Sequence, residues 1–265
     1  MTATAYSVGG TWATWDMGFG ADVCRIVADE NEWTALQNEI FGVEARFRRQ
    51  GVSYPGSFGP VAGPIDAQSY ADSVEIGVDE HVRLINDIPG PFFTAGYSQG
   101  AEVVRRVQLE LINGRLTHRR SDCRAIITFG DPMRQKTDVT LGGGTGWGIS
   151  KIIIPPNDIP VRTYALPGDM YATCPDGVSG DLMHACYAAL TELEIPLNSD
   201  LFSSIFSNAG LFHMVMSLLS NPVKYAPGVV DALIRLAQFA ATGAHGGYGP
   251  YVGDAVNFIN GLDWG

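Results

Sequence analysis

One five-residue segment, residues 96–100, reads Gly-Tyr-Ser-Gln-Gly and constrains the fold of this chain more than any other. Residues 92–96 are apolar and typical of a buried strand, and residues 101–113 carry an amphipathic helical pattern. The glycines matter because only residues without a side chain let a strand and the following helix approach closely through a sharp turn. The segment therefore predicts a strand, a tight turn that raises Ser98 above the strand end, and a helix.

The same alternation of apolar strands and helical segments continues along the chain and predicts an α/β fold with a mostly parallel central sheet. The strands are expected at residues 5–8, 92–96, 125–129 and 161–165, with a further short one at 152–154. The helices are expected at residues 21–30, 67–88 and 101–113. In such a sheet the strand, turn and helix around Ser98 are typical of the nucleophile elbow of α/β-hydrolases.

Composition narrows the class of protein. The 265 residues carry a formal net charge of −11, which argues against nucleic acid as the main partner. With 46% hydrophobic and 17% charged residues the chain is typical of a packed globular protein, and no apolar run is long enough to predict a membrane span. Residues 1–6 lack the basic and apolar run of a secretory signal, so we expect a chain made in the cytoplasm.

The four cysteines give no sign of a metal site. They are widely spaced, without a Cys-x-x-Cys pair, so we expect neither zinc nor another cofactor. Cys174 and Cys186 flank a turn and are close enough in sequence to form a disulfide. Free thiols are the more frequent outcome in a reducing cytoplasm.

Beyond residue 176 the pattern changes to apolar helical stretches broken by proline and glycine, and no strand is expected there. We therefore expect residues 1–175 and 241–265 to form the α/β core. Residues 176–240 are expected to form a helical linker or cap subdomain, inserted before the last part of the core.

Ser98 needs a general base, because a free hydroxyl is a weak nucleophile. The other histidines are His81, His118, His184 and His213. His81 precedes Ser98, and His118 lies in a basic surface turn. His184 and His213 lie in helical patterns, where a structural histidine is the simpler interpretation. His245 lies in a glycine-rich loop near the C-terminus, and α/β-hydrolases order these residues as nucleophile, acid and base. The order favours His245.

The acid must come between Ser98 and His245. Asp169 is favoured, because it follows the strand expected at 161–165 and could fix the histidine tautomer. Asp131 also follows a strand, but a carboxylate before proline is often a turn former. Asp158 is a weaker third candidate.

An oxyanion hole completes the predicted site. In α/β-hydrolases one N–H comes from the residue after the nucleophile and another from a loop after an early strand. These positions predict Gln99 and Thr11, the latter within the Gly-Gly-Thr-Trp loop at residues 9–12. An ordinary glycine-rich turn is a nearly equal interpretation of that loop.

Several motifs together resemble the lysin B esterases of mycobacteriophages, which are related to cutinases. They are Tyr-Ser-Gln-Gly-Ala at 97–101, Gly-Asp-Pro-Met-Arg-Gln-Lys at 130–136 and Gly-Asp-Met-Tyr-Ala at 168–172, with Gly-Thr at 10–11 and Tyr-Pro at 54–55. The resemblance covers most of the α/β core in the same order. It is weak in the helical segment.

The resemblance implies a cutinase-like α/β-hydrolase with Ser98, Asp169 and His245 as its triad and a helical linker subdomain. The implied activity is hydrolysis of the ester between mycolic acids and arabinogalactan, at the host envelope after release from the cell, by a monomer without a cofactor. The chain departs from the family pattern at Gly9, where members carry histidine, and at Asp131, where they carry asparagine. A general cutinase or lipase, an acyl transferase and a non-catalytic envelope-binding protein remain alternatives.

Overall fold

A computed structural model describes residues 2–37, 46–59, 66–191 and 243–264. Its strands are β1 Ala3–Val8, β2 Phe47–Gly51, β3 Phe92–Tyr97, β4 Cys123–Phe129, β5 Val139–Leu141 and β6 Val161–Tyr164. Its helices are α1 Phe19–Gln37, α2 Tyr70–Asp87, α3 Gln99–Asn113, α4 Val178–Thr191 and α8 Val252–Asn260. The strands form one sheet in the order β2-β1-β3-β4-β6-β5, and every neighbouring pair is parallel. The expected parallel sheet is confirmed.

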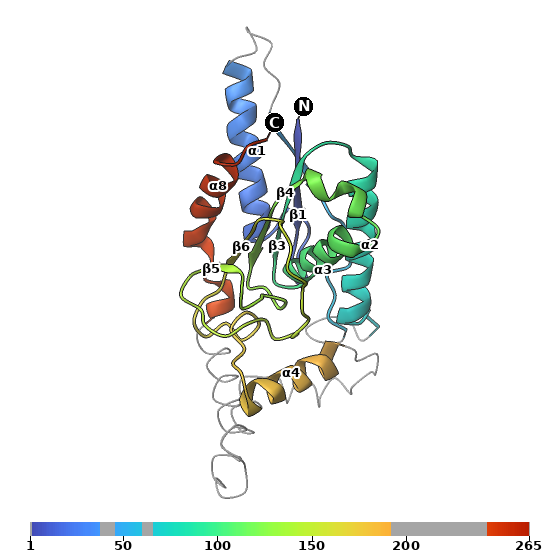
Figure 1. Ribbon diagram of the computed structural model, residues 1–265, viewed down its shortest axis with the longest axis vertical. Helices are drawn as coiled ribbons and strands as arrows, with labels where there is room; N and C mark the ends of the chain where they lie inside the picture. Colours follow the sequence, from blue (N-terminus) through green and yellow to red (C-terminus); the bar gives the residue numbers. More distant parts are fainter. Residues whose placement is uncertain (1, 38–45, 60–65, 192–242, 265) are drawn as a thin grey trace, which may run out of the picture.

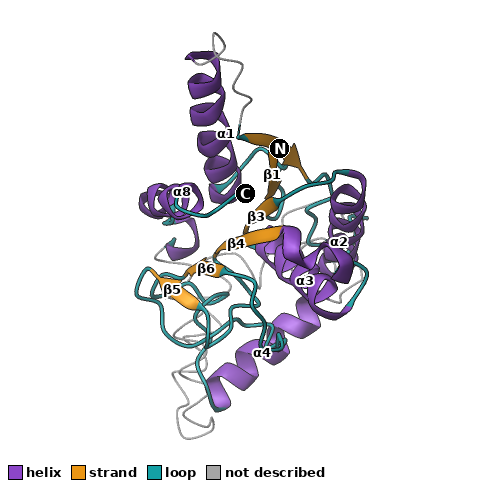
Figure 2. Ribbon diagram, turned by 45° about the horizontal axis from the view of Figure 1, so that its top comes forward, coloured by secondary structure: helices purple, strands orange, loops and turns teal. Residues whose placement is uncertain are grey.

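Helices cover both faces of this sheet. Helices α2 and α3 pack together on one face, and α1 and α8 pack together on the other (Figure 1). The strands run from the end that holds both termini toward the end that holds α4, so their carboxyl ends share one edge (Figures 1 and 2). In open α/β sheets this edge is where ligands bind. Among the described residues no helix combines the length and apolar character that crossing a bilayer requires.

The predicted helices and four main strands are confirmed, with ends shifted by up to seven residues. Helix α2 begins after Ser69, whose hydroxyl accepts the Asp72 N–H at 3.0 Å as an N-cap. Its apolar face is buried as the pattern indicated, and so is that of α3. The sequence did not predict β2 or β5. Both lie at the sheet edges, and neither carries the continuous apolar run of a central strand.

The strand expected at residues 152–154 is wrong. This segment has no regular secondary structure and pairs with no strand, and the side chain of Ile153 is 65% exposed. The side chain of Gln135 binds backbone groups that a neighbouring strand would otherwise bind. Its Nε2 donates to the Ile152 carbonyl at 2.9 Å, and its Oε1 accepts the Ile154 N–H at 3.2 Å. Two prolines follow at 155–156, and proline has no N–H to donate to a sheet.

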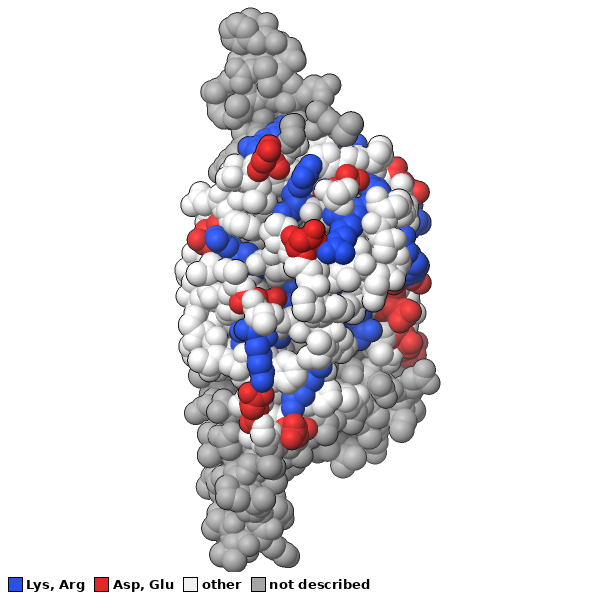
Figure 3. Space-filling view, in the orientation of Figure 1, with Lys and Arg blue, Asp and Glu red and all other residues white. Residues whose placement is uncertain are grey.

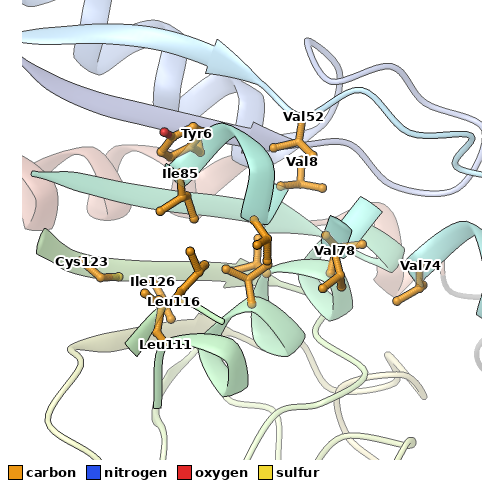
Figure 4. Packing of buried hydrophobic residues seen from close by; sticks show 14 of the residues in the cluster. Tyr6, Val8, Val52, Val74, Val78, Ile85, Leu111, Leu116, Cys123 and Ile126 are labelled. Carbon is orange, nitrogen blue, oxygen red and sulfur yellow. The ribbon is translucent and has the colours of Figure 1, made fainter. Parts of the chain in front are cut away.

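The hydrophobic core lies on both sides of the sheet. One cluster joins α2 and α3 to the sheet, and Figure 4 shows members from all three, such as Val78, Leu111 and Ile126. The other joins α1 and α8 to the opposite face, with Phe47, Phe93 and Trp264 in edge-to-face contact. Burial of each large aliphatic or aromatic side chain contributes roughly 1.5–3 kcal/mol. The two clusters therefore fix the sheet between its helical layers.

Helix α4 begins the predicted helical segment and is tied to the core by a buried carboxylate. Glu102 Oε2 accepts the Tyr187 hydroxyl of α4 at 2.5 Å and the Tyr70 hydroxyl of α2 at 3.0 Å. Residues 192–242 lie outside the described residues, and so do His213 and the side chain of Cys186. The division into core and helical subdomain and the state of the Cys174–Cys186 pair therefore stay predictions.

His81 of α2 gives the fold a predicted sensitivity to acid. It is fully buried beside Tyr6, and neither ring nitrogen has a hydrogen-bond partner among the described residues. Burial lowers the pKa of His81 from 6.5 to about 3. The unfolded chain therefore binds the proton more readily than the folded chain does. The contribution of neutral His81 to the free energy of unfolding is complete above pH 6.5, and it is lost as the pH falls toward 3. At pH 5 the loss is about 2 kcal/mol.

Urea unfolding of the wild type and of His81→Leu at pH 7.5 and pH 5 tests this. The wild type is expected to lose about 2 kcal/mol more stability than the variant over this interval. The exposed His118 provides the control, because His118→Gln should behave as the wild type does. Equal losses in the wild type and His81→Leu would contradict the assignment.

Candidate active site

Ser98 occupies the sharp turn between β3 and α3. Its backbone has φ 56° and ψ −122°, a region that residues with a side chain rarely adopt. Such a conformation costs about 1–3 kcal/mol and persists only where surrounding contacts hold it. The Ser98 N–H donates to the Phe129 carbonyl of β4 at 3.0 Å, which fixes the turn to the sheet. The hydroxyl thereby stands at the positive end of the α3 dipole.

The structure brings the three residues favoured by the sequence together at the carboxyl edge of the sheet. His245 Nε2 lies 2.7 Å from Ser98 Oγ, and His245 Nδ1 lies 2.9 Å from Asp169 Oδ2. His245 belongs to a short 3-10 helix, Ala244–Gly246, far from both partners in sequence. Gly130 lies directly against the imidazole and Asp169, since a Cβ there would be 2.8–3.0 Å from both side chains. Its missing side chain leaves room for the His245–Asp169 pair.

Asp169 is fully buried and is held by several donors. Its Oδ1 accepts the Tyr171 N–H at 3.1 Å, and its Oδ2 accepts the Tyr248 hydroxyl as well as the imidazole N–H of His245. Burial, followed by the charge of Asp169, raises the pKa of Tyr248 far above 10, so this hydroxyl stays protonated and keeps donating. These donors compensate the cost of burying a carboxylate.

Two tyrosines position His245. The Tyr97 hydroxyl donates to the His245 carbonyl at 2.9 Å, and burial raises the pKa of Tyr97 to about 12. The rings of Tyr97 and Tyr171 lie 5.1 and 4.8 Å from the imidazole, measured between centroids. The imidazole is thus held by ring contacts and backbone anchoring in addition to Asp169. The sequence did not identify Tyr97, Tyr171 or Tyr248 as site residues, although each lies within three residues of a predicted one.

The rival carboxylates lie in other environments. Asp131 is fully buried, and its oxygens accept the Met133 N–H at 2.7 Å and the Thr128 hydroxyl at 3.1 Å, with Arg105 Nε at 3.3 Å. Burial raises the pKa of Asp131 to about 7, against the opposing charge of Arg105. Asp158 has an 82% exposed side chain and pairs with Arg120. Asp131 is thus bound in a buried cluster with Arg105, and Asp158 in a surface ion pair.

Among the other histidines, His184 Nδ1 lies 2.9 Å from the Ile149 carbonyl, which agrees with a structural interpretation. His118 is exposed, as the basic surface turn indicated.

The predicted oxyanion residues lie on two segments that approach the serine. Gln99 is the first residue of α3, so its N–H has no acceptor inside the helix. The loop after β1 approaches from the other side, since a Cβ on Gly10 would lie 3.3 Å from Ser98 Cβ. In this loop the Trp12 N–H is bound to the Gly56 carbonyl at 2.7 Å. The donors expected from the sequence, Gln99 and Thr11, therefore lie on the two segments that border Ser98.

A serine hydroxyl, an imidazole and a buried carboxylate in one hydrogen-bonded row can perform nucleophilic acyl transfer. The described residues contain no group of three or more His, Cys, Asp or Glu side chains placed to hold a metal ion.

The chain is similar to one protein family model and to several known proteins. The family model of the PE-PPE domain matches residues 45–173. The chain is 28% identical over 239 residues to endolysin B of Mycobacterium phage L5, which covers 83% of each protein. The crystal structure of lysin B from Mycobacteriophage D29 covers 98% of this chain and 99% of its own, with a TM-score of 0.58 and 23% identity. The resemblance to lysin B and the α/β-hydrolase fold are confirmed.

A further match, to an acyltransferase, covers a much shorter segment. Over 65 residues the chain is 43% identical to the SL1278 acyltransferase Chp1 of Mycobacterium tuberculosis (strain ATCC 25618 / H37Rv). This stretch is 24% of this chain and 16% of that protein, so the match covers one segment of each.

Proposed function

We propose that this lysin B-like chain is a serine esterase that hydrolyses the ester between mycolic acids and arabinogalactan of the mycobacterial envelope during phage-induced lysis. The observation that carries the catalytic part is the row of hydrogen bonds from Ser98 through His245 to Asp169. The similarity to endolysin B over most of the chain supports a lipid ester as the substrate. We propose that the enzyme acts as a monomer, without a metal or organic cofactor, after release from the host cytoplasm.

In the first step, His245 Nε2 takes the proton of the Ser98 hydroxyl as Ser98 Oγ attacks the ester carbonyl carbon. The N–H groups of Gln99 and Thr11 would stabilise the resulting oxyanion. Asp169 keeps the imidazole in the tautomer with hydrogen on Nδ1 and stabilises its positive charge. The sugar hydroxyl then leaves with the proton from His245, and the acyl group remains on Ser98.

In the second step, His245 removes a proton from water, which attacks the acyl-enzyme carbonyl. The bond to Ser98 Oγ breaks, Ser98 regains its proton from His245, and the free acid departs. The net reaction consumes one water and one ester and yields one acid and one sugar hydroxyl.

Release of free mycolic acid from purified mycolyl-arabinogalactan tests the proposal, with p-nitrophenyl butyrate as a parallel substrate. The wild type and the control Ser121→Ala, an exposed serine near the other end of β4, should release the acid, and Ser98→Ala should not. Hydrolysis of the nitrophenyl ester alone would reduce the function to that of a general cutinase or lipase. Inactivity toward both substrates would favour a non-catalytic envelope-binding protein.

The match to an acyltransferase segment favours one second candidate, transfer of the acyl group to a sugar hydroxyl in place of water. The same triad performs both reactions, because only the second nucleophile differs. Adding a soluble sugar to the mycolic acid assay separates them: a transferase forms a new sugar ester, whereas a hydrolase continues to release free acid.

A further inference from the structure

One oxygen of Asp169 accepts hydrogen bonds from two side chains. Asp169 Oδ2 lies 2.9 Å from His245 Nδ1 and also accepts the hydroxyl of Tyr248. The proposed reaction uses only the contact with His245. A hydrogen bond to a carboxylate stabilises its charged form, so a carboxylate with a second donor attracts a neighbouring proton less strongly. The Tyr248 hydroxyl therefore draws on the same negative charge that stabilises the imidazolium.

The hydroxyl of Tyr248 is directed at Asp169 by its surroundings. Tyr248 Oη accepts the Leu166 N–H at 3.4 Å, and its own hydrogen is donated to Asp169. The side chain is fully buried, and its ring contacts the rings of Phe19 and Phe129 at 5.7 and 6.0 Å between centroids. Because these ring contacts do not involve the hydroxyl, removing the oxygen alone should leave the ring in place.

Tyr248 and His245 reach Asp169 from the same short segment. They are three residues apart, and the Gly247 N–H between them donates to the Ala244 carbonyl at 3.1 Å. We propose that Tyr248 is a positioning residue, which draws charge from Asp169 and so lowers the pH above which His245 can act as the base. The inference rests on the proposed function, because it concerns the base of that reaction.

Other titratable and charged groups lie around His245 and Asp169, and all of them are kept when the Tyr248 hydroxyl is removed. They are Ser98, Tyr97, Tyr171, Arg134 and, after Gly130, Asp131 with its partner Arg105. The guanidinium of Arg134 interacts with the charge of Asp169 and donates to the Ala172 carbonyl at 2.6 Å. On the face in Figure 3, basic and acidic side chains lie beside one another. A comparison of Tyr248→Phe with the wild type therefore isolates the hydroxyl.

The pH dependence of kcat/KM on p-nitrophenyl butyrate tests the inference. Activity falls at low pH, because a protonated imidazole cannot accept the Ser98 proton. Without the hydroxyl, more of the charge of Asp169 is available to the imidazolium. Tyr248→Phe is therefore expected to lose activity about one pH unit higher than the wild type, a tenfold change in the proton equilibrium. At higher pH, where the rate no longer changes, the variant should keep most of its activity.

Tyr164→Phe is the matched control. Tyr164 is also fully buried, and its hydroxyl donates to a different carboxylate, Asp254 Oδ1 of α8, at 2.6 Å. The control thus loses the same kind of hydrogen bond without touching the three proposed catalytic residues. Its activity should fall at the same pH as that of the wild type.

NMR gives a second measurement that needs no substrate. The imidazole C–H signals of His245, assigned by their absence from His245→Ala, report the pH at which the ring takes up its proton. This pH should rise in Tyr248→Phe and stay unchanged in Tyr164→Phe. A merely structural role would lower the rate of Tyr248→Phe at every pH without moving either midpoint.

The outcomes separate the inference from the proposed function. If the wild type hydrolyses ester but the midpoints of Tyr248→Phe are unchanged or lower, the inference is overturned and the esterase proposal stands. An equal rise in Tyr164→Phe would also overturn it, because any buried hydroxyl would then have the same effect. If the NMR midpoint rises only in Tyr248→Phe but no ester is hydrolysed, the role of Tyr248 toward His245 stands and the esterase proposal fails.

Discussion

Alanine at Ser98 or at His245 is expected to lower kcat on p-nitrophenyl butyrate by about 10⁶, and the double variant should fall no further. The two side chains share one proton transfer through the 2.7 Å contact between His245 Nε2 and Ser98 Oγ. Loss of either partner removes the same step, so their effects cannot add. Asp169→Asn should cost about 10⁴, because an amide can hold the imidazole in the wrong tautomer.

Burst kinetics and steady-state rates on the four variants measure this, with His118→Ala as a control for a histidine that is exposed and outside the site. The control should retain the wild-type rate. A double variant a further thousandfold slower than either single variant would mean that Ser98 and His245 act independently. A His245→Ala variant with a tenth or more of the wild-type rate would mean that another group is the base.

Most of the fold was predictable because the central strands are buried on both faces. β1, β3 and β4 consist mainly of apolar or small residues that are buried, and the helices beside them carry one apolar face each. Their environment can therefore be predicted from the local sequence. The edge strands were not predictable in this way. β2 reads Phe-Arg-Arg-Gln-Gly and β5 has three residues, so their pairing depends on neighbours that are distant in sequence. Residues 152–154 had the apolar pattern but not the partner strand.

The candidate site, too, contains residues that the sequence predicted and residues that it did not. Ser98 was identified from its local turn, and Asp169 and His245 from their order along the chain. The donors that hold them were not, because the contacts of Tyr248 with Asp169 and of Tyr97 with His245 join residues 79 and 148 positions apart. The Arg105–Asp131 pair is a similar case. The sequence marked Asp131 as a departure from the family pattern, but only the structure places the buried arginine beside it.

Gly100→Ala is expected to destabilise the protein by about 3 kcal/mol, at the upper end of the range for overpacking a core. A Cβ at this position would overlap the carbonyl oxygens of Val8 and Gly9, well inside the 3.0 Å that real Cβ atoms keep. Both obstacles are backbone atoms at the end of β1 and the start of the loop that borders Ser98. Since no side chain can rotate away, either α3 or β1 must shift, and both carry the proposed active site.

Thermal unfolding should show a midpoint roughly 10 °C below that of the wild type. Gly253→Ala is the matched control: Gly253 lies in α8, a Cβ there meets nothing within 4 Å, and alanine should leave stability unchanged or raise it by up to about 1 kcal/mol. The Gly100→Ala variant should also lose activity at temperatures where it remains folded, because the Ser98 turn and the loop after β1 would move together. A variant with wild-type stability and activity would show that β1 and α3 can separate without disturbing the site, and that Gly100 is not what fixes their distance.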